Sequence, residues 1–370
     1  MQKKQVAVLD VGSSKITAVV GERGINKTFV IKSRFDFNYD GFVDGEFLNI
    51  EELKSVLFDA VSSLKNVLGK GLKTVYLGVP SEFTDVFVKE SQISFDSKKK
   101  ITEEDLDSLY ESAFIVAPTK SELINRSAVN FELDDFRKLA NPIGCKSSIL
   151  KGRLSFVYCK EYFINNVKNV VLRAGADMVE CVSVSLAEAM YLLEAPVRDR
   201  IAIICDVGYI TSTFSIIQGD GIIYEKTIPF GGGIITGALT DKLETSFTIS
   251  ESLKRKVNLS SRSNGGSFDI VSGDDGKYYS LETVKNSVLN SLDGFCEQIS
   301  VAIEDSNYIL PEHVPFFVTG GGIAFLRGAK EHLSSRLGMV VSVLTPIVPL
   351  MENPLESSIL SILDLALEQI

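Results

Sequence analysis

Histidine is scarce in this sequence, which contains only His313 and His332. Two histidines leave little room for histidine-based catalysis or for a histidine metal site. The cysteines are few and scattered, with no paired spacing, which indicates buried thiols in a reducing cytosol and excludes a disulfide framework or a zinc motif. The five are Cys145, Cys159, Cys181, Cys205 and Cys296.

Long apolar runs are also missing. No window reaches the 18 apolar residues that a membrane-spanning helix requires. The first residues lead directly into a strand pattern, without the apolar region and cleavage site of a signal peptide. We therefore expect a cytoplasmic protein. Its net charge of −10 argues against non-specific nucleic-acid binding as its main task.

The chain is too long for one ordinary core. Its 370 residues, 45% of them hydrophobic and 23% charged, predict a soluble globular protein of two or more domains. Alternating and continuous apolar runs predict a strand-rich opening, with a helix over Ile50–Leu68 where apolar residues recur at helical spacing. The strands of this opening are expected at Gln5–Val11, Ile16–Gly21, Phe29–Phe35 and Leu72–Pro80.

A smaller unit follows. We expect strands at Val86–Val88 and Ser91–Phe95, and a loop over Asp96–Lys100. For the three lysines of this loop, a solvated turn is preferred over a lipid or partner contact. Thr102 is expected to cap a helix whose first turn is acidic, as the helix dipole favours. Beyond it, strands and helices alternate. They are expected at Leu154–Lys160 (strand), Glu161–Ala174 (helix), Met178–Val184 (strand) and Leu186–Glu194 (helix).

The segment "CDVGYITSTF", Cys205 to Phe214, repeats the plan of "LDVGSSKITAVV", Leu9 to Val20. Each has a short apolar run, Asp-Val-Gly, hydroxyl residues and a second apolar run. This internal duplication predicts an α/β fold of two similar domains, with ligands bound in the cleft between them.

The second half continues with helices at Ile234–Leu243 and Ser250–Lys256 and a long amphipathic helix at Leu281–Ser306. The polar segment Asn258–Lys277 is expected to be a surface loop with short strands at most. The segment "VPFFVTGGGIAF" is expected to form strand, glycine turn and helix, and Asn353–Ile370 a helix packed on the first domain.

Three motifs have the chemistry of a nucleotide site. In "DVGSSK", Gly12 allows close backbone approach to a phosphate, Ser13 and Ser14 are donors, Lys15 is a point charge, and Asp10 can hold Mg²⁺ through waters. Alone, this motif also fits an ordinary hairpin turn.

The glycines of "VTGGGIAFLRG" allow a base or ribose to lie against the backbone. The motif "SESLKRK" places Glu251 and Lys254 on one helix face, where a surface ion pair is the simpler interpretation.

Taken in order, these motifs resemble the actin-like ATPase superfamily and, within it, the FtsA family of bacterial cell-division proteins. The segments "GFVDGEFLNIEELKSVL", "ITEEDLDSLYESA", "TIPFGGGIITGALTDKL" and "FFVTGGGIAFLRGAKEHLSSRLGMVV" resemble family segments, so the resemblance covers nearly the whole chain. It implies a duplicated, ribonuclease-H-like fold of two domains with an FtsA-type inserted subdomain. The implied subdomains are IA (1–82, 153–198 and 355–370), IC (83–152), IIA (199–229 and 308–354) and IIB (230–307).

The resemblance also implies ATP and Mg²⁺ as ligands. Asp10 and Asp206 would flank Mg²⁺, and Glu251 and Lys254 would hold the ribose and the adenine edge. The other implied nucleotide contacts are Gly12, Ser13, Ser14, Lys15, Gly208, Thr211, Gly320, Gly321 and Gly322.

The sequence departs from the family at the second phosphate loop. Tyr209 and Ile210 replace two glycines, and Thr213 replaces the last acid. The tyrosine ring could block the close approach of a phosphate, or swing outward and leave it intact.

A second departure concerns hydrolysis. The family carries a glutamate that orients the attacking water, and Val184 stands at that position, with Ser185 in place of the following proline. Valine cannot orient a water or accept its proton, and Glu188, one helical turn on, is a weak substitute. We expect no assignable catalytic residue and at most weak ATPase activity.

The third departure is the C-terminal segment. The family continues into a basic amphipathic membrane helix, but residues 337–370 contain four acids and no Lys or Arg. We therefore expect no direct membrane anchor in this chain, and a position at the inner face of the membrane or at the division site through partners.

The preferred function is a nucleotide-responsive scaffold that links filaments of the tubulin-like FtsZ to other division components. FtsZ would bind through residues 230–307, self-association into filaments is a further expectation, and no nucleic-acid partner is expected. The alternatives are a pilus-assembly scaffold of the PilM type, or an active ATPase or kinase of the same superfamily.

Overall fold

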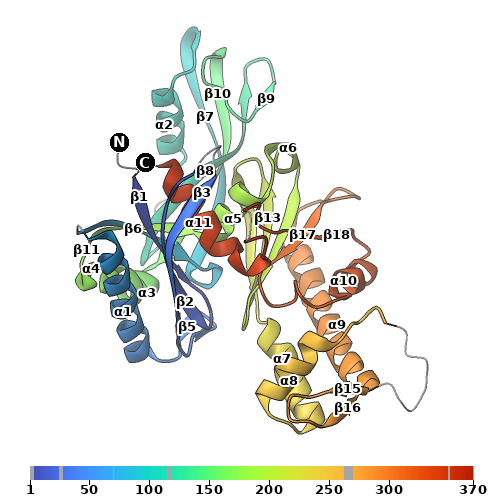
Figure 1. The fold of residues 1–370 in the computed structure, drawn as a ribbon. Coiled ribbons are helices and arrows are strands. Elements are labelled where there is room, and N and C mark those ends of the chain that lie inside the picture. The colour runs from blue at the N-terminus through green and yellow to red at the C-terminus, as the bar shows by residue number, and fades with distance from the viewer. Residues whose placement is uncertain are drawn as a thin grey trace. The chain divides into compact units, whose positions relative to one another are not determined.

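A computed structural model describes residues 4–24, 28–69, 71–114, 118–261, 270–348 and 351–369. The chain divides into two compact units (Figure 1). The first comprises residues 1–202, 215–225 and 357–370, and the second comprises residues 203–214 and 226–356. The four-subdomain division stays a prediction, and part of the segment 258–277 and the last residue lie outside the described residues.

The main sheet of the first unit has the strand order β11-β6-β1-β2-β3. β1 pairs in parallel with β6, and β6 with β11, whereas β1-β2 and β2-β3 are antiparallel hairpin pairs. The predicted strand-rich opening is therefore confirmed, and it consists largely of hairpins. The strands are β1 (Gln5–Val11), β2 (Lys15–Arg23), β3 (Phe29–Asn38), β6 (Leu72–Val79) and β11 (Ala176–Ser183), with the short pair β4 (Phe42–Val43) and β5 (Glu46–Phe47).

Helix α1 (Ile50–Leu68) has the predicted bounds. Its N-cap Asn49 accepts a hydrogen bond from the backbone N–H of Glu52, and Gly69 ends it in the left-handed conformation at φ 62°. The apolar stripe that gave the prediction is buried against β2, which forms much of the core of this unit. Local capping and periodicity agree here, so the boundaries could be predicted from sequence.

The helix expected over Glu161–Ala174 is interrupted by one π-helical segment. It consists of α3 (Glu161–Phe163), the π segment Ile164–Lys168 and α4 (Asn169–Ala174). The sequence pattern does not distinguish α from π geometry, because both bury one side of the segment.

The C-terminal helix α11 (Ser357–Glu368) packs against α5 (Val184–Leu192) and against strands β1, β2 and β6. It follows the turn Pro354–Glu356, and its apolar residues are buried in the first unit as expected. The short helix α6 (Ala195–Arg198) and the turn Ser81–Phe83 complete this part of the unit. Among the described residues, none of the helices combines the length and the apolar character needed to cross a membrane.

The inserted part of the first unit is a sheet of order β7-β10-β8-β9. The two predicted strands between Val86 and Phe95 are one long strand, β7 (Thr84–Lys100), so the lysines at its end belong to the sheet and not to a solvated turn. The other strands are β8 (Ser121–Leu133), β9 (Lys138–Leu139) and β10 (Lys146–Lys160), and helix α2 (Glu103–Ser112) covers a separate apolar core. Thr102 caps α2 through a capping box with Asp105, as predicted.

The second main sheet has the order β14-β13-β12-β17-β18, in which β12, β17 and β18 are parallel. Its strands are β12 (Ala202–Val207), β13 (Ser212–Gln218), β14 (Gly221–Ile228), β17 (Phe316–Thr319) and β18 (Val341–Val343). The helices of the second unit are α7 (Gly232–Leu243), α8 (Phe247–Lys256), α9 (Leu281–Asp305) and α10 (Ala329–Leu337), with the hairpin β15 (Ile270–Ser272) and β16 (Tyr278–Ser280). The helix expected directly after the glycine turn begins later, at Ala329, because turns occupy the residues between.

Candidate functional site

The predicted first phosphate loop is the tight turn between β1 and β2. The backbone N–H of Gly12 donates to the carbonyl of Lys15 at 3.0 Å, which closes the turn. Tyr39 supports it from outside: its hydroxyl donates to the carbonyl of Gly12 at 2.8 Å, and its N–H donates to the carbonyl of Ser14 at 3.3 Å. Burial and the nearby charges of Asp10 and Glu82 raise the pKa of Tyr39, so the hydroxyl stays protonated. Tyr39 was not among the predicted site residues.

Lys15 has a partner within the sheet. Its ammonium lies 3.3 Å from the carboxylate of Asp36, which also accepts hydrogen bonds from Thr17 at 2.8 Å and Arg34 at 2.8 Å. Burial raises the pKa of Asp36, but the hydrogen bonds from Arg34 and Thr17 outweigh it and lower the pKa to about 2. A phosphate at the loop would therefore compete with a carboxylate for Lys15.

Val184 lies beside Asp10. Gly78 pairs with Asp10 across β1-β6, and a Cβ atom at Gly78 would lie 3.4 Å from Oδ1 of Asp10. The same point lies 3.1 Å from Cγ2 of Val184. Val184 is the first residue of α5 and not the end of a strand, and the residue is 8% exposed. A methyl group of Val184 and the carboxylate of Asp10 therefore border the same point beside Gly78, and Glu188 is buried further along the same helix.

The predicted second phosphate loop follows β12 and has the same closing hydrogen bond as the first. The N–H of Gly208 donates to the carbonyl of Thr211 at 3.0 Å, which matches the bond from Gly12 to Lys15. The predicted duplication of the two turns is therefore confirmed at the level of backbone hydrogen bonding.

The second loop is joined to the start of α7. The N–H of Gly232 donates to the carbonyl of Gly208 at 3.0 Å, and the N–H of Gly233 donates to the carbonyl of Tyr209 at 2.7 Å. A Cβ at Gly233 would lie 3.2 Å from two ring atoms of Tyr209, so the ring rests against this glycine. The ring is 40% exposed and meets Phe247 edge to face at 6.4 Å between centroids. The predicted nucleotide contacts do not include the glycines at the start of α7, although the sequence motif "FGGG" is a signal that could have identified them.

The glycine turn after β17 contacts the same loop. Gly320 has φ 83°, and a Cβ there would lie 2.1 Å from Oδ1 of Asp206. The N–H of Gly322 donates to the carbonyl of Val207 at 2.7 Å, and a Cβ at Gly232 would meet the carbonyl of Gly322 at 2.9 Å. Gly321 lies between them, and a Cβ there would meet the side chain of Leu355 at 2.2 Å. These close approaches require glycine at Gly320, since both its conformation and its surroundings exclude a side chain.

Glu251 and Lys254 lie in α8 and form an internal network with α7. Lys254 donates to the carboxylate of Glu251 at 2.7 Å, to the carbonyl of Gly232 at 2.8 Å and to the hydroxyl of Thr236 at 2.9 Å. Thr236 in turn donates to Glu251 at 2.5 Å, and Arg255 donates at 2.8 Å. Burial lowers the pKa of Lys254; for Glu251, burial raises the pKa but the three donors outweigh it and lower it. The predicted pair is thus mostly buried and not a simple surface ion pair.

The chain is similar in sequence to FtsA proteins of several bacteria, although no family profile matches it. The FtsA of Pseudomonas aeruginosa is 21% identical over 371 residues, which cover 96% of this chain and 87% of that protein. The FtsA of Enterococcus hirae is 23% identical over 96% of this chain and 81% of its own length. The match to the FtsA of Streptococcus pneumoniae is 25% identical and spans 66% of this chain but 54% of that protein. At 21% to 23% identity, the chain is similar to these FtsA proteins over nearly its full length.

Solved structures show that this FtsA-like chain has the actin-like fold. A chain of the PilM-PilN type IV pilus biogenesis complex matches with a TM-score of 0.65 and 14% identity over 99% of both chains. MreB5 of Spiroplasma citri, solved with AMPPNP, matches with a TM-score of 0.58 and 15% identity over 100% of this chain and 97% of its own.

The predicted site residues of the FtsA-like chain fall into both units. Asp10 and the loop Gly12–Lys15, including Ser13, belong to the first unit, and the remaining candidates belong to the second. Each group is brought together within its own unit. The pairing of Asp10 with Asp206 across Mg²⁺ stays a prediction. Within the described ranges, no three His, Cys, Asp or Glu residues form a cluster that could hold a metal by themselves.

Proposed function

We propose that this chain is a nucleotide-responsive scaffold of bacterial cell division, with weak or absent ATP hydrolysis. The observation that carries the proposal is the position of Val184 beside Asp10. An active site at this point needs a group that orients or deprotonates water, and a methyl group does neither. Loss of a general base typically lowers the rate by a factor of about 10² to 10⁴.

Nucleotide binding would also be weakened. Phosphate loops bind through backbone N–H groups that face the ligand. Here the N–H groups of Gly208, Gly232 and Gly233 are bonded within the protein, the Tyr209 ring covers Gly233, and Lys15 is paired with Asp36. To bind these groups, ATP with Mg²⁺ would therefore have to replace contacts that they already make within the protein. When bound, the nucleotide would supply phosphate charge that Lys15, Ser13 and Ser14 could hold.

The first test separates binding from hydrolysis. A fluorescent ATP analogue with Mg²⁺ is titrated into the native chain and into Tyr209→Gly, and phosphate release is measured for the same proteins. We expect weak binding by the native chain, tighter binding by Tyr209→Gly, and turnover near background for both. Turnover comparable to that of active relatives, lost on Asp206→Ala, would refute the proposal.

The second test restores the missing group. Val184 begins α5, where the helix dipole favours an acid, and Val184→Glu supplies the carboxylate that the resemblance to FtsA implies at this position. We expect phosphate release to rise about tenfold or more in Val184→Glu, on the scale of a restored general base. Val184→Gln is the matched control, because it has the same shape without a basic oxygen, and an equal gain in both variants would argue against a general-base role at this position.

The partner we propose is an FtsZ-type filament, bound through the region 230–307, and the resemblance to FtsA supports it. Self-association of the chain into filaments is a further proposal on the same ground. The location would be the cytoplasm, at the inner face of the membrane or at the division site. Co-pelleting with polymerised FtsZ tests the partner directly.

A PilM-type role in pilus assembly is the second candidate, because a chain of the PilM-PilN complex shares the fold over nearly its full length. Binding of a pilus-protein peptide without FtsZ co-pelleting would favour that role. An active kinase or ATPase is less well supported, since Val184 offers no acid or base at the first aspartate.

A further inference from the structure

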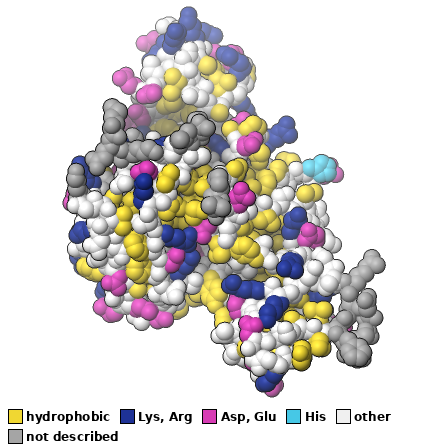
Figure 2. Space-filling model, viewed as in Figure 1, with side chains coloured by type: hydrophobic (Ala, Val, Ile, Leu, Met, Phe, Trp, Pro, Cys, Tyr) yellow, Lys and Arg dark blue, Asp and Glu magenta, His cyan; other side chains and the backbone are white. Residues whose placement is uncertain are grey.

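One end of the inserted sheet gathers basic residues around an exposed phenylalanine. We name it the basic tip: Lys98, Lys99, Lys100, Arg137, Lys138 and Lys146, with Phe136 and Ile143. The strand register places these segments together, since Lys100 pairs with Lys146, and Ile101 exchanges backbone hydrogen bonds with Gly144 and Cys145. Figure 2 shows Lys and Arg side chains gathered at this end of the inserted sheet.

Phe136 occupies the turn between β8 and β9 in an unusual state. It has φ 63°, a left-handed conformation that bulky residues rarely adopt, and it is 78% exposed. Its N–H donates to the carbonyl of Leu133 at 3.0 Å, and the N–H of Leu133 donates to the carbonyl of Arg137 at 3.2 Å. A left-handed turn position favours Asn or Gly, so the backbone conformation does not explain a phenylalanine here. Burial does not explain it either, because the residue is exposed.

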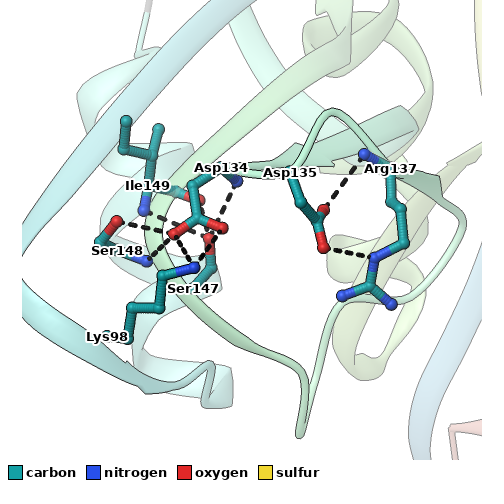
Figure 3. A network of polar contacts seen from close by, with 7 residues as sticks. All are labelled: Lys98, Asp134, Asp135, Arg137, Ser147, Ser148 and Ile149. Atoms are coloured by element: carbon teal, nitrogen blue, oxygen red, sulfur yellow. Dashed lines mark hydrogen bonds and ion pairs between the residues drawn. The ribbon is translucent and has the colours of Figure 1, made fainter.

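Polar contacts on both sides hold this turn in place (Figure 3). On one side, Asp134 accepts hydrogen bonds from the N–H of Ser148 at 3.0 Å and from its hydroxyl at 2.7 Å, and pairs with Lys98 at 3.1 Å. The N–H of Asp134 donates to the hydroxyl of Ser147 at 3.0 Å. On the other side, Asp135 pairs with Arg137 at 2.7 Å. These contacts therefore fix the turn that carries the exposed Phe136.

The same contacts determine which basic side chains of the tip are left without an acidic partner in the described part of the chain. Residues 96–100, 133–138 and 143–146 contain six Lys and Arg and three Asp. Two of the three acids, Asp134 and Asp135, are already paired as described, and Lys99 is paired with Asp105. In the part of the chain that the structure describes, the exposed Lys100, Lys138 and Lys146 make no ion pair. The next exposed acids along the chain after Lys100 are Glu103 and Glu104, in the first turn of α2.

We propose that the basic tip docks on an anionic phospholipid surface, with Phe136 inserted among the headgroups and the lysines on the lipid phosphates. An aromatic ring flanked by lysines is the arrangement that partitions into a charged interface. A stable protein partner would need a broad contact, typically about 800 Å² on each side, whereas only Phe136 and Ile143 are large exposed apolar residues here. This contact is peripheral, and it differs from the anchor helix that we do not expect at the C-terminus.

The test is sedimentation of the full chain with vesicles of phosphatidylcholine alone or with a third phosphatidylserine. We expect binding only to the anionic vesicles, and its loss at high salt. Phe136→Asn keeps a residue suited to the left-handed turn and should weaken partitioning about tenfold, from the lost apolar burial. Lys100→Glu, Lys138→Glu and Lys146→Glu together should weaken it at least about a hundredfold, since each lysine contributes about fivefold near such a surface.

Matched controls come from the rest of the chain. Tyr278→Asn removes an aromatic side chain that is 71% exposed in the second unit, and Lys73→Glu, Lys89→Glu and Lys242→Glu reverse three exposed lysines elsewhere. Both should bind as the native chain does. Absence of native binding to anionic vesicles, or equal losses in tip and control variants, would overturn the proposal. Binding of an acidic polyglutamate peptide without vesicle binding would also overturn it, in favour of an acidic protein partner. None of these outcomes depends on nucleotide or on FtsZ.

Discussion

Replacing Gly78 by alanine should destabilise the first unit at the point where Asp10 and Val184 meet. A Cβ at this position would lie 2.5 Å from Cδ1 of Ile362 in α11 and 3.1 Å from Cγ2 of Val184. The backbone itself tolerates alanine, because Gly78 lies in β6 and has no positive φ. The cost therefore comes from overpacking, which is typically about 1–3 kcal/mol.

Two terms set the net size. Alanine in a strand interior gains about 0.5–1 kcal/mol over glycine from reduced backbone entropy in the unfolded chain. Subtracting this gain from the overpacking cost leaves a net loss of roughly 0–2.5 kcal/mol. Ile362→Val removes the clashing Cδ1 and should cost about 0.5–1.5 kcal/mol alone. Combined with Gly78→Ala, it should cost less than the sum, because the cavity that it leaves accepts the new methyl group.

Urea unfolding followed by circular dichroism measures all four members of this cycle. Gly294→Ala is the control, since a Cβ there meets nothing within 4 Å, and it should stabilise helix α9 by about 0.5–1 kcal/mol. Additive losses in the double variant, or a stabilising Gly78→Ala, would mean that α11 does not pack on the sheet at Asp10 as described.

Three further outcomes are expected. Tyr39→Phe removes the hydroxyl that supports Gly12 and should weaken binding of a fluorescent ATP analogue several-fold, at a stability cost of about 1 kcal/mol in urea unfolding; unchanged affinity would show that the loop needs no support from Tyr39. Gly320→Ala should cost more than about 2 kcal/mol by thermal unfolding, because its φ of 83° and the nearby Asp206 both exclude a side chain, and a loss below 1 kcal/mol would contradict the turn. Burial raises the pKa of Glu225 despite hydrogen bonds from Thr84 and Ser215. The folded state therefore binds this proton more tightly than the unfolded state. The native chain should lose stability as pH rises above about 4.5. Glu225→Gln should remove this loss. The free energy of unfolding, measured at pH 5 and pH 8, should therefore rise for the variant relative to the native chain at the higher pH. A difference between the two proteins that does not depend on pH would count against a buried proton.

The local parts of the fold could be read from the sequence. The bounds of α1 and the capping box at Thr102 follow from contacts within a few residues, and so does the closing bond shared by the two Asp-Val-Gly turns. The sequence does not predict the full length of β7, because its second half is polar and lysine-rich and only pairing with β10 keeps it extended. The helix after Gly322 was placed too early, because nothing local distinguishes successive turns from a first helical turn.

The sequence alone determined which residue types the site contains, since a motif fixes the loop and its donors. The tertiary structure decided what those donors contact. Lys15 meets Asp36 only through the register of β2 and β3, and Lys254 meets Gly232 only because α8 packs on α7. Val184 is recognisable in the sequence as a missing glutamate, but its place beside Asp10 depends on three adjacent strands and a helix start. Such contacts join residues far apart in the chain, and their geometry is set by packing that no local pattern encodes.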